Sequence, residues 1–103
     1  MDKQELTDWA LKNGWQMLAD HPSLVKPHRP KDAIVRLVFK ASVVHVEVKK
    51  PSGKWEKLSG APYAEVTYDA EVDMPRGLGL DTIPSFGMLM RENKDAQVFG
   101  KFK

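Results

Sequence analysis

The clearest pattern of apolar and polar positions in this sequence lies between residues 43 and 49. Valine stands at every even position of this stretch, VVHVEVK, and His45, Glu47 and Lys49 stand at the odd positions that follow. Side chains alternate between the two faces of a strand. A period of two therefore predicts a half-buried strand whose even-numbered valines face the core.

A second apolar row precedes this strand. Val35, Leu37 and Phe39 share one face of an extended chain, and the residues between them are largely apolar too. A strand that is apolar on both faces is typical of the interior of a sheet. The core positions are odd-numbered over residues 35–39 and even-numbered over residues 44–48. A turn or a bulge between the two rows must therefore change the alternation by one residue. We expect a turn at residues 40–42, and a bulge in one long bent strand is the alternative.

The downstream end of the valine-rich stretch carries a turn signature. In Lys50-Pro51-Ser52-Gly53, proline presets φ at the second position of a type I turn, and glycine accepts the positive φ that often follows. The sequence therefore predicts a β-hairpin whose second strand covers residues 54–59.

Residues near the N-terminus repeat with helical spacing. Asp2, followed three residues later by Glu5, is a capping-box pattern. With Asn13-Gly14 as a C-terminal signal, a helix is predicted from about residue 3 to residue 13, and residues 15–19 are expected to follow as a short strand. The buried face of this helix is predicted to hold Leu6, Trp9 and Ala10.

Turn-forming residues divide the segments that remain. Three prolines in HPSLVKPHRP predict an extended loop without regular structure over residues 21–30. Alternation over residues 63–70 predicts a further strand, with a helix starting at Pro62 as the alternative. Residues 74–82 are expected to form a loop, because two glycines and a proline interrupt them.

The C-terminal segment fits two structures. Pro84 as a first helical residue and the apolar stripe that follows it predict a helix to about Asn93. The same residues also fit a strand that turns at residues 92–95 and returns through residues 98–102. Together the elements predict an α+β fold, with an N-terminal helix on an antiparallel sheet of about four or five strands and this segment, as helix or hairpin, completing the core.

Length and composition predict one soluble domain spanning residues 1–103. The chain has 103 residues, of which 42% are hydrophobic, and a chain of this length builds one core rather than two. No apolar run approaches the roughly 20 residues that span a bilayer, and the N-terminal sequence is charged rather than signal-like. The absence of cysteine fits a reducing compartment, so we expect a cytoplasmic protein without a membrane partner.

The net charge of +2 hides a separation of charge along the chain. Residues 26–57 contain nine Lys and Arg against three acidic residues, a local balance of +6. Residues 61–81 contain five acidic residues against Arg76, a balance of −4. Two such segments create a dipolar surface if they fold to different faces, and they neutralise each other if they pair.

Most of the basic residues belong to the predicted hairpin region, residues 36–57. Nucleic-acid binding needs cations spaced to meet successive phosphates and an aromatic ring that can stack on an unpaired base. A two-stranded ribbon is also narrow enough to enter a duplex major groove. The structural alternative is a lysine-rich sheet edge that prevents aggregation, with Trp55 folded onto the core. The predicted contact residues are Arg36, Lys40, Lys49, Lys50, Lys54, Trp55 and Lys57.

One constellation in the same region resembles a nuclease site. Glu47 and Lys49 lie two apart on one strand, hence on one face, and Asp32 opens the preceding strand. HVEVKK and its lead-in PKDAIV resemble the core of the PD-(D/E)xK nucleases, including the small archaeal Holliday-junction resolvases. The resemblance implies Mg²⁺ held by Asp32 and Glu47, and hydrolysis assisted by Lys49. The sequence departs from that family in Lys31, which separates Pro30 from Asp32, and no clear amphipathic helix follows the second strand.

The remaining polar clusters are expected to be solvated. His21 and His28 have no cysteine or carboxylate at ligand spacing. Asp69, Glu71 and Asp73 alternate on one strand face, but a site for a hard cation needs ligands from more than one segment.

The leading expectation is therefore a non-enzymatic protein that binds or accompanies DNA or RNA without a cofactor. One alternative is a protein-binding regulator or inhibitor module that uses its sheet edge or its Met-rich C-terminal segment. The other alternative is the Mg²⁺-dependent nuclease.

Overall fold

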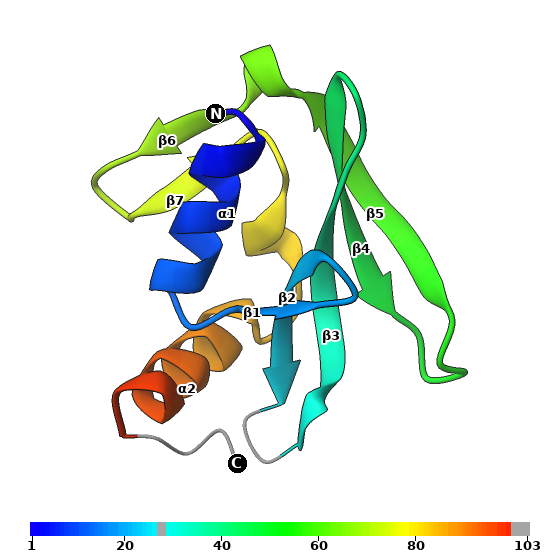
Figure 1. Ribbon diagram of the computed structural model, residues 1–103, viewed down its shortest axis with the longest axis vertical. Coiled ribbons are helices and arrows are strands. Elements are labelled where there is room, and N and C mark those ends of the chain that lie inside the picture. Colours follow the sequence, from blue (N-terminus) through cyan, green and yellow to red (C-terminus); the bar gives the residue numbers. More distant parts are fainter. Residues whose placement is uncertain (27–28, 100–103) are drawn as a thin grey trace.

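The computed structural model describes residues 1–26 and 29–99, and it has the α+β architecture that the sequence predicts (Figure 1). The first part of the chain contains α1 (Lys3–Lys12), β1 (Gln16–Leu18), β2 (His21–Lys26), β3 (Arg29–Phe39), β4 (Val43–Lys49) and β5 (Trp55–Pro62). The second part contains the 3₁₀ turn η1 (Tyr63–Glu65), β6 (Thr67–Asp69), β7 (Met74–Arg76), the 3₁₀ turn η2 (Leu80–Thr82) and α2 (Phe86–Phe99). In these described segments, no helix combines the length and apolar character that crossing a bilayer requires.

Strands β1 to β5 form one antiparallel sheet in sequence order, and both helices cover the same face of it (Figure 1). The register pairs Leu37 of β3 with Val46 of β4. The odd-numbered row of β3 and the even-numbered row of β4 therefore face the same side, as their alternation predicts. The core between this face and the helices includes Leu6, Trp9, Trp15, Leu24, Val35, Leu37, Val44, Val46, Leu78, Leu80, Phe86 and Met90.

Both turns predicted for the central strands are present. The amide of Lys40 donates to the carbonyl of Val43 at 2.8 Å, so the chain reverses at residues 40–42 and does not continue as one bent strand. Gly53, with φ of +87°, donates to the carbonyl of Lys50 at 2.9 Å and closes the second turn. β5 extends beyond the strand that the sequence predicts.

The N-terminal helix is confirmed together with its capping box. The carboxylate of Asp2 accepts from the amide of Glu5 at 2.8 Å, and the carboxylate of Glu5 accepts from the amide of Asp2 at 3.0 Å. Asn13 caps the C-terminus, and Gly14, with φ of +87°, turns the chain into β1. Local capping chemistry therefore sets both ends of α1.

The prediction of a loop without regular structure over residues 21–30 is wrong, because β2 and the start of β3 occupy this segment. Pro22 fits at the second position of β2, where its partner belongs to the three-residue edge strand β1. Leu24 and Val25 are fully buried, and their burial favours the extended chain over a solvated loop. The prediction for His28 falls outside the described residues.

The segment after β5 is less regular than predicted. Of the strand expected over residues 63–70, only β6 forms, and it pairs with β7 in a separate two-stranded sheet. The alternative helix at Pro62 is reduced to the single turn η1. The expected loop over residues 74–82 contains β7 and η2, because Leu78 and Leu80 are buried in the core and draw the chain inward.

The C-terminal segment is the helix of the two predicted alternatives. α2 starts two residues after Pro84, because Ser85 has a φ of +60° that a helix does not accept. Asn93, fully buried, donates from Nδ2 to the carbonyl of Val25 at 2.8 Å and ties α2 to β2. Positions 98 and 99 belong to α2, and the rest of the alternative return strand, residues 100–102, lies outside the described residues.

Candidate nucleic-acid interface

The sheet face that points away from the helices carries a row of polar residues. The register aligns one residue from each of the five strands, and aligned partners lie on the same face. Arg36 stands at the centre of this row, on the central strand β3. From β1 to β5 the row is Gln16, Ser23, Arg36, Glu47 and Lys57.

Arg36 joins Glu47 and Trp55 into one cluster. Its Nη2 lies 2.7 Å from Oε1 of Glu47, and its Nε donates to the same oxygen at 2.8 Å. Its Cζ lies 4.1 Å from the centroid of the Trp55 ring, so the guanidinium covers the ring. Only 23% of the Arg36 side chain and 20% of the Glu47 side chain are exposed. The ion pair therefore holds the Arg36–Trp55 stack in one orientation on the outer face.

An open depression lies at the end of the hairpin, between β3 and the β4–β5 turn. Its volume is about 430 Å³. Asp32 lies on its wall, with Nζ of Lys26 at 3.7 Å and Nζ of Lys49 at 3.6 Å from its carboxylate. Both distances are long for charge-assisted hydrogen bonds. The lining residues are Lys26, Asp32, Lys49, Lys50, Pro51 and Gly53, so three ammonium groups face one carboxylate.

The structure brings most of the predicted contact residues together, with one exception. Lys54 is exposed in the turn before β5, and Lys57 is exposed on β5. Neither makes a salt bridge to any part of the chain that the structure describes. Lys50 lies 3.7 Å from Glu56, with both side chains about half exposed, so this surface pair is weak. Lys40 is in the β3–β4 turn, at the opposite end of β4 from the depression.

The three residues of the nuclease-like pattern are only partly assembled. Asp32 and Lys49 are in contact, as the pattern requires, whereas the carboxylate of Glu47 is bound by Arg36. Metal coordination by Glu47 would require Arg36 to move away. Within residues 1–26 and 29–99, the His, Asp and Glu side chains form no group of three that could hold a metal ion.

The acidic segment lies on a different side of the molecule. The β6–β7 hairpin sits beside α1, away from the turn that joins β4 and β5 (Figure 1). Two of its carboxylates bind partners within the same hairpin, since Arg76 lies 2.6 Å from Asp69 and the Tyr68 hydroxyl donates to Asp73. The hydrogen bond from Arg76 lowers the pKa of Asp69, and the hydrogen bond to Asp73 raises the pKa of Tyr68. The charge separation along the sequence is thus a dipolar surface.

Sequence reasoning missed the place of Lys26 and of the polar row. The prolines around Lys26 predict a loop, and only the pairing of β2 with β3 brings Lys26 to Asp32. The contact of Arg36 with Glu47 could be anticipated from the sequence, because the predicted turn at residues 40–42 fixes the register between their two strands. No feature of the sequence predicts the half-buried position of Trp55.

Comparisons with known proteins leave function to be inferred from the chain itself. No family model matches the sequence, and no match was found among curated proteins or among solved structures.

Proposed function

We propose that this chain binds nucleic acid through the outer face of its β4–β5 hairpin. The observation that carries the proposal is the set of lysines near the Arg36–Trp55 stack. Lys49 lies 5.9 Å from the centroid of the Trp55 ring, Lys57 is paired in register with Glu47, and Lys26 and Lys50 line the depression with Lys49. The hairpin that carries most of them lies away from the acidic hairpin (Figure 1). The positive end of a dipolar surface attracts a polyanion and orients it before contact. Such attraction does not depend on nucleotide sequence.

The lysine-rich depression supplies the phosphate contacts in this proposal. Asp32 satisfies Lys26 and Lys49 only loosely, at 3.7 and 3.6 Å. A phosphate carries more charge and more acceptor oxygens than one carboxylate, so it competes for both lysines. Lys50 also lines the depression, and Lys54, on the turn beside it, extends the path along a nucleic-acid backbone.

The Arg36–Trp55 stack supplies the contact to bases. Flat guanidinium groups and aromatic rings both stack on unpaired bases. The ion pair with Glu47 already orders the arginine, so little conformational entropy is lost when a base stacks. Unpaired bases are required, and we therefore expect single strands to bind more tightly than duplexes.

Fluorescence anisotropy with labelled DNA and RNA tests the proposal. Single and double strands of about 20 nucleotides, longer than one binding site, are titrated at several salt concentrations. Binding near micromolar affinity at low salt is expected, with a slope of log K against log salt of about −2 to −3 for three to four phosphates on a single strand. No saturable binding at low salt would contradict the proposal.

Two exposed turn lysines provide a matched pair of variants. Neither Lys54 nor Lys40 makes a salt bridge among the described residues, so each can be changed without freeing a partner. Lys54→Gln should flatten the salt slope by about 0.7. Lys40→Gln, at the other end of β4, should leave the slope unchanged. Equal effects of the two variants would mean that binding is spread over the whole surface.

The same titration separates the alternative functions. Products of reactions with and without Mg²⁺ are run on a denaturing gel. Magnesium-dependent cleavage that Asp32→Ala abolishes would support the nuclease reading, for which the Asp32–Lys49 contact is the favourable observation. Intact strands with salt-dependent binding support the non-enzymatic proposal.

A further inference from the structure

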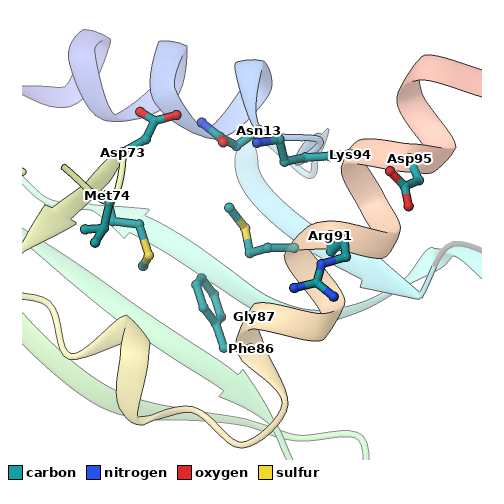
Figure 2. Close-up of a pocket in the computed structure, with 10 residues that line it drawn as sticks. Asn13, Asp73, Met74, Phe86, Gly87, Arg91, Lys94 and Asp95 are labelled. Atoms are coloured by element: carbon teal, nitrogen blue, oxygen red, sulfur yellow. The ribbon is translucent and has the colours of Figure 1, made fainter. Parts of the chain in front are cut away.

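A pocket lies on the helical side of the sheet, apart from the basic hairpin. It opens between the end of α1, the β6–β7 turn and the first turns of α2, and its volume is about 420 Å³. This volume lies within the range of small-molecule sites, which is about 300–1,000 Å³. Figure 2 shows Met74 and Phe86 reaching toward the same space from β7 and from α2, with Arg91 bordering it.

The floor of the pocket is apolar and belongs to the core. Phe86 and Met90 line it and are also buried in the core. Trp15 supports both from behind, because its ring centroid lies 6.3 Å from that of Phe86 and its Nε1 donates to Sδ of Met90. Val72, which is 55% exposed on the β6–β7 turn, also lines the pocket. A ligand that covers this surface gains from its removal from water.

Gly87 keeps the space open. A Cβ atom at this position would meet no other atom within 4 Å. Glycine in a helix costs about 0.5–1 kcal/mol relative to alanine, and neither a positive φ nor a close backbone contact requires one here. A larger side chain in the first turn of α2 would occupy the pocket.

Cations of α2 follow Gly87 along the same helical face. Arg91 and Lys94 stand four and seven residues after it, the spacing of one helix face, and both line the pocket. Neither makes a salt bridge to another residue in the segments that the structure describes. Two carboxylates also line the pocket. Asp73 accepts a hydrogen bond from the Tyr68 hydroxyl, and Asp95 lies one turn beyond Arg91.

We infer that this pocket binds a small organic carboxylate with an apolar, preferably aromatic, body. The body lies on Phe86 and Met90, and the carboxylate is bound by the guanidinium of Arg91 with Lys94 beside it. Arginine suits this role because its planar fork matches a carboxylate. Asp73 keeps its negative charge when it accepts this hydrogen bond, so two cations and two carboxylates line the pocket. Among the described residues, however, neither carboxylate lies within salt-bridge distance of Arg91 or Lys94, so the guanidinium remains available to the carboxylate of a ligand.

Phenylpropionate, phenylpropanol and phenylpropylamine are matched probes for the inference, since they share a body and differ in charge. Each is titrated into the ¹⁵N-labelled 103-residue chain, and the backbone amide shifts are followed by NMR. Phenylpropionate should bind saturably below about 1 mM and shift amides of residues 72–74 and 86–95, with the other two probes at least about tenfold weaker. Equal affinity of the three probes, shifts confined to the hairpin, or no saturable binding of phenylpropionate would overturn the inference.

Variants at Gly87 and Arg91 test the pocket itself. Gly87→Leu should abolish binding of phenylpropionate by filling the space, and Gly87→Ala should retain it. Arg91→Gln should reduce its affinity about tenfold or more, to that of phenylpropanol. Met88→Leu, an exposed neighbour outside the pocket, is the control. Unchanged binding in Gly87→Leu would assign the ligand to another surface.

Discussion

Gly14 sets how closely α2 approaches the end of α1, and Gly14→Ala tests this packing. A Cβ atom at position 14 would lie 2.7 Å from the backbone carbon of Asn93 and 2.8 Å from the amide nitrogen of Lys94. Both atoms belong to the backbone of a helix, so they cannot yield by a change of rotamer. Gly14 also has a φ of +87°, which disfavours any side chain.

Two costs add in this variant. The left-handed conformation costs a non-glycine residue about 1–2 kcal/mol. Forcing α2 away from position 14 costs about 1–3 kcal/mol more, as in other overpacked cores. We therefore expect Gly14→Ala to lower the free energy of unfolding by about 2–5 kcal/mol, and the melting temperature by about 5 °C for each kcal/mol in a domain of this size.

Two other glycines separate the costs. Gly53 has the same φ of +87°, but a Cβ atom there would meet nothing within 4 Å, so Gly53→Ala measures the conformational cost alone. Gly87→Ala has neither cost and should raise the free energy of unfolding by about 0.5–1 kcal/mol. Urea denaturation followed by circular dichroism gives all three values. If Gly14→Ala were no more destabilising than Gly53→Ala, α2 would not pack against position 14 as described.

Further predictions concern a buried amide and an exposed ion pair. Asn93→Ala removes the donor to the carbonyls of Val25 and Leu89. It should lower the free energy of unfolding, measured by urea denaturation, by about 1–3 kcal/mol. A loss below about 0.5 kcal/mol, the range of neutral surface changes, would mean that these hydrogen bonds add nothing to stability. The pKa of Asp69 is lowered in the folded state, chiefly by the hydrogen bond from Arg76, so its contribution to stability is present above the unfolded-state pKa and is lost as the pH falls through the lowered value. In Arg76→Gln the carboxyl pKa of Asp69, followed by NMR, should rise, and an unchanged pKa would exclude Arg76 as the cause.

Local sequence patterns correctly predict the parts of the fold whose signals lie within a few residues. The alternation in β4, the turn at Lys50–Gly53 and the capping box of Asp2 and Glu5 each rest on contacts within one or two short segments. The physical causes are side-chain alternation, the φ preferences of proline and glycine, and hydrogen bonds to the first helical amides. These elements are confirmed because the signals that set their boundaries are local, although their stability also depends on burial of one face in the core.

Local patterns do not predict the structure of residues 21–30 and 63–82 correctly. The prolines indicate a loop, yet burial of Leu24 and Val25 between neighbouring strands and α2 makes β2 a strand. Likewise, Leu78 and Leu80 enter the core and separate β6 and β7 from the main sheet. Tertiary burial outweighs local propensity in both segments, because hydrophobic area removed from water stabilises more than propensity costs.

By itself, the sequence determined the α+β class, the central hairpins and the basic character of residues 36–57. Alternation and turn chemistry act over a few residues, and they can be recognised before the chain is folded. Only the tertiary structure decided that Arg36 stacks on Trp55 and that the acidic hairpin occupies another side of the molecule. It also created the pocket beside Gly87. These features join segments far apart in the chain, so they depend on register and on how the helices pack.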